Sequence, residues 1–391
     1  MFLDIAQPLV FTPPWHMSFG ERLAMLHGGG RRIAYFYENP DTSTFRYRVL
    51  NPVQAINKDL RPAFSASWFC MADLMEKKRF IDDVEILVLC RTKYGPEVAD
   101  LLAQANARNI ELYFDCDDLV FDPNRVHLVL DSLDIKNANV EHWDAFYAYS
   151  ARLSLIFDRA ENFIGTNDYL LNNVKRISPL KKLHKLENFL NAEQQIISRD
   201  MYFIKKQWNR DERIHIGYFS GSPTHVKDFA VALPALKRLM TADDRINLRI
   251  VGFAVFSEAF AEFGDRVEII PLQDYLNLQR LVAEVEINIA PLQLNDFTNC
   301  KSELKYFEAA ACGTLTIASP TYAFSHAIEH GRTGILSVAQ DWDSALARAV
   351  RLVEDRKAYQ EVVDAAFDHV TRIYGFDRFS AKLETIFNPA R

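Results

Sequence analysis

The sequence contains two series of short apolar runs, and each run is followed by a stretch with the apolar spacing of a helix. In the first series the clearest runs cover residues 32–37, 84–89, 110–114 and 162–165. In the second series they cover residues 214–219, 248–253, 267–270, 287–290 and 315–318. Because strand and helix alternate in both series, we expect parallel sheets with right-handed crossovers.

A segment from residue 179 to residue 211 separates the two series. It is rich in Lys, Asn and Gln, and we interpret it as a linker. The sequence therefore predicts an α/β protein with two Rossmann-like, doubly wound domains that face a cleft. The expected parts are residues 1–190, residues 212–370 and a terminal helical stretch over residues 371–391. In such a fold the ligand binds at the carboxyl ends of the strands.

Composition excludes several classes of protein. The formal charge of -7 argues against a nucleic-acid partner, which requires a concentrated basic surface. No stretch has the roughly 18 consecutive apolar residues that cross a bilayer, and the first residues lack the basic region of a secretory signal. The five cysteines contain no CxxC pair, which fits a reducing compartment. We expect a cytoplasmic protein, at most attached peripherally to a membrane.

The most specific motif, NCKSELKYFEAAACG, covers residues 299–313. Lys301 and Ser302 stand where a helix is expected to start, so an ammonium, a hydroxyl and backbone N–H groups could bind an anion such as a diphosphate. Glu308, about two turns further on, could accept hydrogen bonds from a ribose diol. Gly313 ends the helix before the next strand. The alternative is a plain helix start at which Ser302 is only an N-cap.

Together with the strands on either side of it, this motif resembles the C-terminal signature of retaining GT-B glycosyltransferases of the family 4-type, or group 1, class. The resemblance implies that Glu308 holds the nucleotide ribose, as the last glutamate of an E-x7-E pattern. Cys300 stands where the first glutamate would contact the donor sugar. Asn295, Asp296 or Asn299 could bind sugar hydroxyls instead. This departure leaves the donor sugar open, and also whether the reaction is retaining or inverting.

The resemblance extends to the turn after residues 214–219, which reads SGSPTHVKD. It implies that Gly221 lets the backbone approach the donor closely and that Lys227 reaches the pyrophosphate. His225 lies where many relatives carry an arginine. The alternative is a capped helix start with an exposed Lys227. The two lysines are candidate catalytic residues that stabilise the leaving diphosphate, and the donor-binding candidates are Gly221, His225, Lys227, Asn299, Lys301, Ser302 and Glu308.

Aspartates cluster directly after the strand at residues 110–114, at Asp115, Asp117 and Asp118. In one interpretation Asp115 and Asp117 hold a divalent cation, as in the D-x-D pair of GT-A transferases. A single GT-A fold would not explain the second half of the chain. In the second interpretation the aspartates face the cleft, where they bind acceptor hydroxyls or orient a base, with Asp117 as a catalytic candidate. In the third, Asp118 caps a helix or pairs with an arginine.

The loop after the first strand carries Arg46 and Arg48, where many relatives have a Gly-Gly turn that faces the donor phosphates. The glycines at residues 28–30 precede the strand and cannot serve in that way. The two arginines could supply positive charge to the leaving diphosphate or hold an anionic acceptor. The alternative is a pair of ordinary charges on the solvent side of a helix.

The resemblance implies a GT-B hexosyltransferase of polysaccharide biosynthesis that moves a sugar from a nucleotide-sugar to a glycan or lipid-linked acceptor. It implies no metal and no cofactor besides the nucleotide-sugar co-substrate. The donor would bind to the second lobe and the acceptor to the first, and the helix over residues 376–387 would return to the first lobe. Two alternatives stay open, a nucleotide-sugar epimerase of the same fold and a non-catalytic sugar-binding or scaffold protein.

Overall fold

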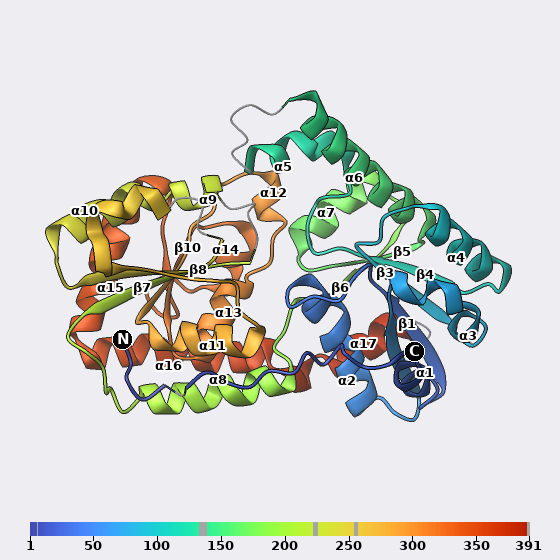
Figure 1. Cartoon of the computed structure of the whole chain (residues 1–391), viewed down its shortest axis with the longest axis horizontal. Coiled ribbons are helices and arrows are strands. Elements are labelled where there is room, and N and C mark those ends of the chain that lie inside the picture. Colours follow the sequence, from blue (N-terminus) through green and yellow to red (C-terminus); the bar gives the residue numbers. More distant parts are fainter. Residues whose placement is uncertain (6, 133–138, 222–225, 254–256, 389–391) are drawn as a thin grey trace.

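The computed structural model describes residues 1–5, 7–132, 139–221, 226–253 and 257–388, which form two lobes side by side (Figure 1). Each lobe has a parallel six-stranded sheet with helices on both faces. No helix in these ranges is both long enough and apolar enough to cross a membrane. The predicted architecture of two doubly wound α/β domains is therefore confirmed.

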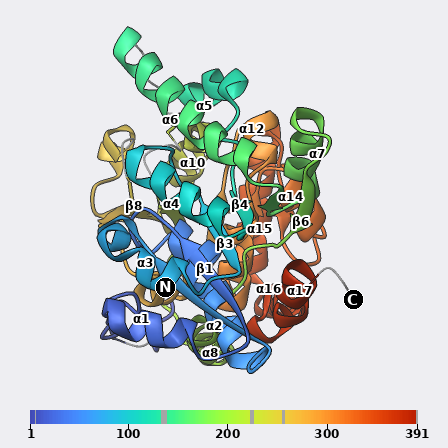
Figure 2. The ribbon, with the colours of Figure 1, turned by 90° about the vertical axis from the view of Figure 1, so that its right-hand side faces the viewer.

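The sheet of the first lobe has the order β2-β1-β3-β4-β5-β6. Its strands are β1 (Arg31–Phe36), β2 (Phe64–Phe69), β3 (Ile86–Cys90), β4 (Glu111–Asp115), β5 (Asn162–Gly165) and β6 (Lys182–Lys185). Its helices are α1 (Phe19–Leu26), η1 (Arg46–Leu50), α2 (Asn51–Asp59), η2 (Met71–Glu76), α3 (Lys78–Ile81), α4 (Pro96–Ala107), η3 (Pro123–Arg125), α5 (Val126–Ser132), α6 (Val140–Arg159) and α7 (Asp168–Ile177). Figure 2 shows α5 and α6 extending beyond the rest of this lobe.

The sheet of the second lobe has the order β12-β11-β10-β7-β8-β9. Its strands are β7 (Ile214–Ser220), β8 (Ile246–Gly252), β9 (Val267–Ile270), β10 (Ile287–Ala290), β11 (Leu315–Ala318) and β12 (Ile335–Leu336). Its helices are α9 (Val226–Ala230), α10 (Leu233–Ala242), η5 (Ser257–Arg266), α11 (Tyr275–Glu284), α12 (Asp296–Asn299), α13 (Leu304–Ala311), α14 (Tyr322–Ala327), η6 (Ala339–Asp341), α15 (Trp342–Glu354) and α16 (Arg356–Tyr374).

The strand order of the second lobe reverses between β10 and β7, which are neighbours in the sheet although the strands β8 and β9 lie between them in the sequence. Such a switch point leaves a crevice at the carboxyl ends of the two strands, because their connections leave the sheet in opposite directions. The two predicted donor motifs follow β7 and β10, so the topology brings them to the same edge of the sheet.

The segment expected to be a linker is largely ordered structure. Residues 182–185 form β6 at the edge of the first sheet, and α8 (Ala192–Lys205) packs against α11 and α13 of the second lobe. The polar composition of the segment hid this helix. Buried side chains of α8, such as Met201 and Tyr202, supply the apolar face that attaches it to the second lobe.

The two ends of the sequence lie on opposite lobes (Figure 1). The backbone N–H of Phe2 donates to the carbonyl of Glu284 at 2.9 Å, and the Phe2 ring packs beside Met201 of the second lobe. Residues 2–5, expected in the first domain, therefore lie on the second. In the other direction, η7 (Phe376–Arg378) and α17 (Ser380–Phe387) return to the first lobe, where α17 packs against α2.

The returning segment completes the core of the first lobe, and this attachment can be tested. Phe379 is fully buried, and its ring stacks on that of Phe189 with 4.0 Å between centroids. We expect Phe379→Ala to lower the free energy of unfolding of the first lobe by about 3–5 kcal/mol in urea denaturation. Lys382→Ala, on the exposed side of the same helix, is the control and should change it by less than about 0.5 kcal/mol. Equal effects of the two variants would show that this helix is not part of the core.

Candidate active site

Arg48 and Asp115 form an ion pair inside the first lobe, with both side chains completely buried. Arg48 Nε lies 2.8 Å from Asp115 Oδ1, and its Nη2 lies 2.9 Å from Oδ2. The same guanidinium donates to the carbonyl of Leu186 at 2.6 Å. The pair therefore fastens η1 to β4 and to the chain after β6. In contrast to the prediction, neither residue faces the cleft, because each one satisfies the charge of the other away from solvent.

Arg91, which sequence reasoning did not single out, holds the other two aspartates of the cluster. Its Nε lies 2.9 Å from Asp117 Oδ1, and its Nη2 lies 2.5 Å from Asp118 Oδ2. Arg91 directly follows β3 with a φ of 43°, a conformation that side chains other than glycine rarely adopt. The cluster thus matches the third interpretation, in which Asp118 pairs with an arginine, and differs from an open pair of carboxylates that awaits a cation.

The loop that follows α12 is attached to the first lobe. Asn167 Nδ2 donates to the carbonyls of Cys300 and Lys301 at 3.0 and 3.2 Å, and Asn188 Nδ2 donates to Ser302 Oγ at 2.9 Å. Lys301 Nζ lies 3.7 Å from Asp118 Oδ1. The predicted Lys301 and Ser302 therefore lie at the junction of the lobes, where each has a partner from the first lobe.

Cys300 and its predicted substitutes are engaged by the protein itself. The Cys300 side chain is fully buried in a cluster with core residues of the first lobe. Asp296 pairs with Arg125, while the side-chain oxygens of Asn295 and Asn299 accept hydrogen bonds from backbone N–H groups. Cys300, at the position of the missing glutamate, therefore forms a contact between the two lobes.

Glu308 lies where three parts of the chain meet. Its Oε1 accepts hydrogen bonds from Arg46 Nη2 at 3.1 Å, from the hydroxyl of Tyr47, and from Gln194 Nε2 at 3.3 Å. Arg46 comes from the first lobe, Gln194 from α8, and Glu308 itself from α13. Oε2 accepts no hydrogen bond from the residues that the structure describes. One carboxylate oxygen therefore fixes the junction, while the other is left to accept a ligand hydroxyl.

Arg46 is the arginine of the predicted pair that reaches the junction. It is buried, and its guanidinium lies over the rings of Tyr47 and Tyr275, with its Cζ 4.0 and 5.1 Å from the two centroids. Neither its Nε nor its Nη1 has a hydrogen-bond partner among the described residues. These two nitrogens beside Glu308 are available to a ligand that carries oxygen acceptors.

Lys305 is a second cation that sequence reasoning missed, although it lies inside the quoted motif. It stands in the first turn of α13, and its Nζ is shielded from solvent without a hydrogen-bond partner among the described residues. The ammonium lies 4.7 Å from the centroid of the Tyr218 ring in β7. A lysine three residues before the ribose candidate could have been singled out by its helical spacing alone.

The turn after β7 is described in part. Gly221 is exposed, and a Cβ at its position would meet no atom of the described part of the chain within 4 Å. His225 lies outside the described residues. Lys227, in α9, pairs with Asp131 of α5 in the first lobe. The predicted phosphate lysine thus contacts the opposite lobe in this arrangement.

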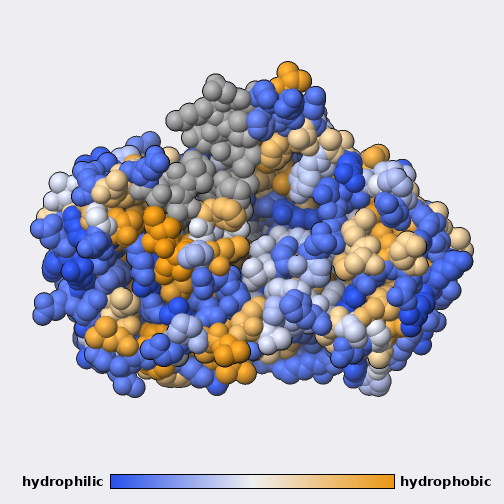
Figure 3. All heavy atoms as spheres, in the orientation of Figure 1, coloured by the Kyte–Doolittle hydropathy of each residue, from blue (hydrophilic) through white to orange (hydrophobic). Residues whose placement is uncertain are grey.

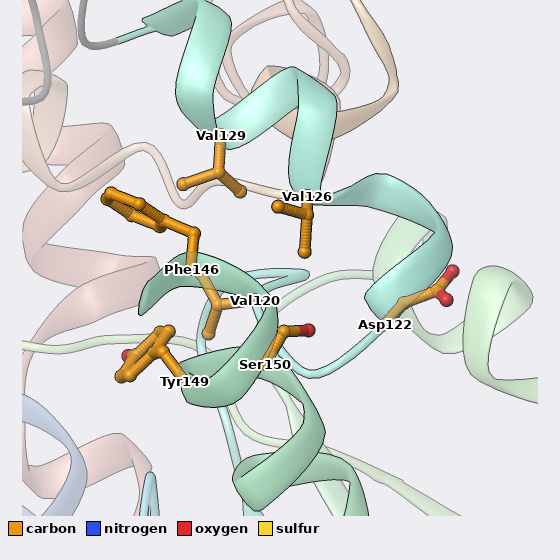
Figure 4. Close-up of a pocket in the computed structure, with 7 residues that line it drawn as sticks. All are labelled: Val120, Asp122, Val126, Val129, Phe146, Tyr149 and Ser150. Atoms are coloured by element: carbon orange, nitrogen blue, oxygen red, sulfur yellow. The ribbon is translucent and has the colours of Figure 1, made fainter. Parts of the chain in front are cut away.

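A small cavity lies behind the aspartate cluster, between α5, α6 and the loop after β4 (Figure 4). Its volume of about 10 Å³ is enough for a single water molecule. Mostly apolar side chains line it, together with Asp122 and Ser150. It cannot hold a substrate. Figure 3 shows neutral and hydrophilic residues side by side on the visible face of the first lobe beside the junction.

The comparisons with known proteins agree with the two-lobed fold. Residues 213–355 match the family of glycosyl transferases group 1. The fold resembles that of HepE from Anabaena, solved with UDP and glucose, with a TM-score of 0.61 and 10% identity over 91% of this chain and 99% of that one. A glycosyltransferase from Rickettsia africae gives a TM-score of 0.61 and 12% identity over 92% of this chain and 100% of that one.

A sucrose-phosphate synthase from Thermosynechococcus elongatus gives a TM-score of 0.59 and 14% identity over 91% of this chain and 98% of that one. None of the curated protein sequences matches this chain. Agreement over nearly the full length of both chains extends to both lobes and to their connection. Residues 213–355 in the second lobe therefore match the glycosyl transferases group 1 family, and the whole chain has the two-lobed GT-B fold of these solved structures.

Proposed function

We propose that the protein transfers a sugar from a nucleoside-diphosphate sugar to a hydroxyl group of a glycan or lipid-linked saccharide, without a catalytic metal ion. The observation that carries the proposal is the junction around Glu308. A carboxylate with one unused oxygen, two N–H donors of Arg46 and the ammonium of Lys305 lie around the start of α13, beside the switch point of the second sheet. These groups match a ribose diol and a diphosphate.

Uridine nucleotides are the first donors to test. HepE, which has a similar fold, was solved with UDP and with UDP-glucose. In our proposal Glu308 Oε2 accepts a hydrogen bond from a ribose hydroxyl, while Oε1 keeps its protein partners. Because Oε1 accepts hydrogen bonds from Arg46 and Tyr47, the Glu308 side chain would then link the nucleotide on Oε2 to the first lobe.

The absence of a metal ion in the proposed reaction is supported by the pairing of charges. The carboxylates of Asp115 and Asp117, which would be the cation ligands, each pair with an arginine. Positive charge at the junction comes from Lys301 and Lys305 instead. Cations placed before the reaction begins can stabilise the departing diphosphate in the way that a metal ion does in other transferases.

The acceptor side of the proposal rests on the first lobe. Asp117 and Arg91 lie at the carboxyl ends of β4 and β3, and the Asp117 side chain is 14% exposed. We propose that Asp117 accepts a hydrogen bond from the attacking hydroxyl and that Arg91 fixes the orientation of the carboxylate. A soluble or lipid-linked saccharide acceptor in the cytoplasm, as in polysaccharide biosynthesis, would be consistent with this polar edge.

The first prediction concerns nucleotide binding. We expect Glu308→Gln to weaken binding of UDP by about 10- to 100-fold, since a charge-assisted hydrogen bond contributes about 1.5–3 kcal/mol. Isothermal titration calorimetry measures this directly, after a thermal-shift screen of UDP, GDP, ADP, CDP and dTDP.

Glu303→Gln is the matched control for this prediction. Burial raises the pKa of Glu303 to about 7, although a hydrogen bond from Tyr374 opposes the shift, so glutamine resembles the protonated form that Glu303 takes in part at neutral pH. This variant should keep its affinity for UDP. If both variants bind UDP as the wild type does, Glu308 has no part in the site.

A second prediction concerns metal ions. Turnover of the donor sugar should be the same within about twofold in excess EDTA and in manganese, because cationic side chains supply the positive charge. The assay follows release of UDP from UDP-glucose, with water or a pool of lipid-linked saccharides as acceptor. Loss of turnover in EDTA that manganese restores would contradict the proposal. Conversion of the donor to an epimer in the absence of any acceptor would indicate an epimerase.

A third prediction separates catalysis from binding. If Lys301 stabilises negative charge that develops on the leaving group, Lys301→Met should lower kcat by roughly 100-fold and change the affinity for UDP much less. Methionine keeps the length and the apolar stem that packs over the Phe297 ring. A variant with the kcat of the wild type at saturating donor would exclude this role, whatever its affinity.

A further inference from the structure

Lys305 carries a positive charge that the protein does not hydrogen-bond. Its Nζ has no partner among the described residues and is shielded from water, with the Tyr218 ring as its neighbour. Burying an ammonium in this way costs free energy that a paired cation does not. By comparison, Lys227 and Lys301 pair with aspartates of the first lobe. A protein can retain a destabilising buried charge of this kind at a site where a bound ligand supplies the missing hydrogen bonds.

The charges that face Lys305 come from three elements. Burial lowers its pKa to about 8, while the carboxylates of Asp228 in α9 and Glu308 in α13 oppose this change and Lys301 adds to it. Asp228 accepts a hydrogen bond from the backbone N–H of Gln293 at 3.0 Å. Neither carboxylate accepts a hydrogen bond from the Lys305 ammonium, so both act on it only through their charge. In the free protein the Lys305 side chain is therefore only partly protonated near pH 8.

The position of Lys305 relative to Glu308 fits one kind of ligand. The two residues are three positions apart in α13, so their side chains are neighbours on one face of the helix. In a nucleoside diphosphate the ribose and the phosphates are joined directly. A ribose on Glu308 therefore places the phosphates within reach of a side chain one turn closer to the start of the helix, beside the carboxyl end of β7.

From this juxtaposition we infer that Lys305 binds the diphosphate of the donor, next to the ribose held by Glu308. The inference rests on the proposed function and adds a residue that neither the motif resemblance nor the comparisons assign. Lys227 then serves a different purpose, since its contact with Asp131 joins the two lobes above the site. Among the residues that the structure describes, Lys305 Nζ has no hydrogen-bond partner, so a bound diphosphate would supply one.

Lys305→Met tests the inference through two effects of opposite sign. Removing a buried ammonium without a partner should raise the melting temperature of the free protein, because methionine fills the same space without the cost of burying charge. The same change should weaken binding of UDP by about 10- to 100-fold in calorimetry. Lys237→Met, at a partly exposed lysine that pairs with Glu262, is the control and should alter neither quantity appreciably.

Proton uptake gives a second readout that a purely structural lysine would not change. Because burial lowers the pKa of Lys305 to about 8, its amine in the free protein is only partly protonated near this pH, whereas a diphosphate beside it favours the protonated form. The phosphates of UDP are themselves ionised at this pH. Binding of UDP to the wild type at pH 8 should therefore take up a fraction of a proton, measured by calorimetry in two buffers of different ionisation enthalpy. Lys305→Met should abolish this uptake, and Lys237→Met should keep it.

The outcomes separate this inference from the proposed function. If UDP binds the wild type, and Lys305→Met binds UDP with the same affinity and the same proton uptake, the role of Lys305 is wrong and the proposed function stands. If Lys305→Met lowers both the affinity and the melting temperature, Lys305 is a structural residue and the inference is again wrong. If none of UDP, GDP, ADP, CDP and dTDP binds the wild type, both proposals fail.

Discussion

The hydrogen bonds on one oxygen atom, Oε1 of Glu308, hold the candidate site together. Arg46 and Tyr47 approach it from the first lobe, and Gln194 approaches it from the helix between the lobes. The helix η1 is held in place in turn by the buried ion pair between its own Arg48 and Asp115 of β4. The carboxylate on which the proposed nucleotide site depends is thus also a hydrogen-bonded contact between the two lobes.

The strands of both sheets could be predicted because each one is a short run of apolar residues between helical stretches. The failures have the same origin. The strand β6 is largely polar because it lies at an edge, and α8 attaches to the second lobe by a few apolar residues in a polar sequence. Local composition cannot show that such a helix has a surface to pack on. The return of residues 376–387 to the first lobe came from the family resemblance rather than from any local pattern.

The sequence predicted which segments form the candidate site, but not which charged side chains pair with one another there. The motif identified the loop and helix that carry Lys301 and Glu308, because a helix start and its spacing are local properties. Which cation meets which carboxylate depends on the neighbours of a strand in space. Arg91 reaches Asp117 because β3 lies beside β4, a fact that sequence distance hides. Lys305 was overlooked for the opposite reason, since its importance lies in having no partner.

The placement of the two ends of the sequence on opposite lobes has a consequence for synthesis on the ribosome. The contacts of Phe2 require residues such as Met201 and Glu284, which are made much later. The core of the first lobe lacks Phe379 and Leu383 until residues 376–387 have been translated, after the whole second lobe. The first lobe therefore cannot reach its final packing as it emerges, and its apolar surface stays exposed until these residues are made.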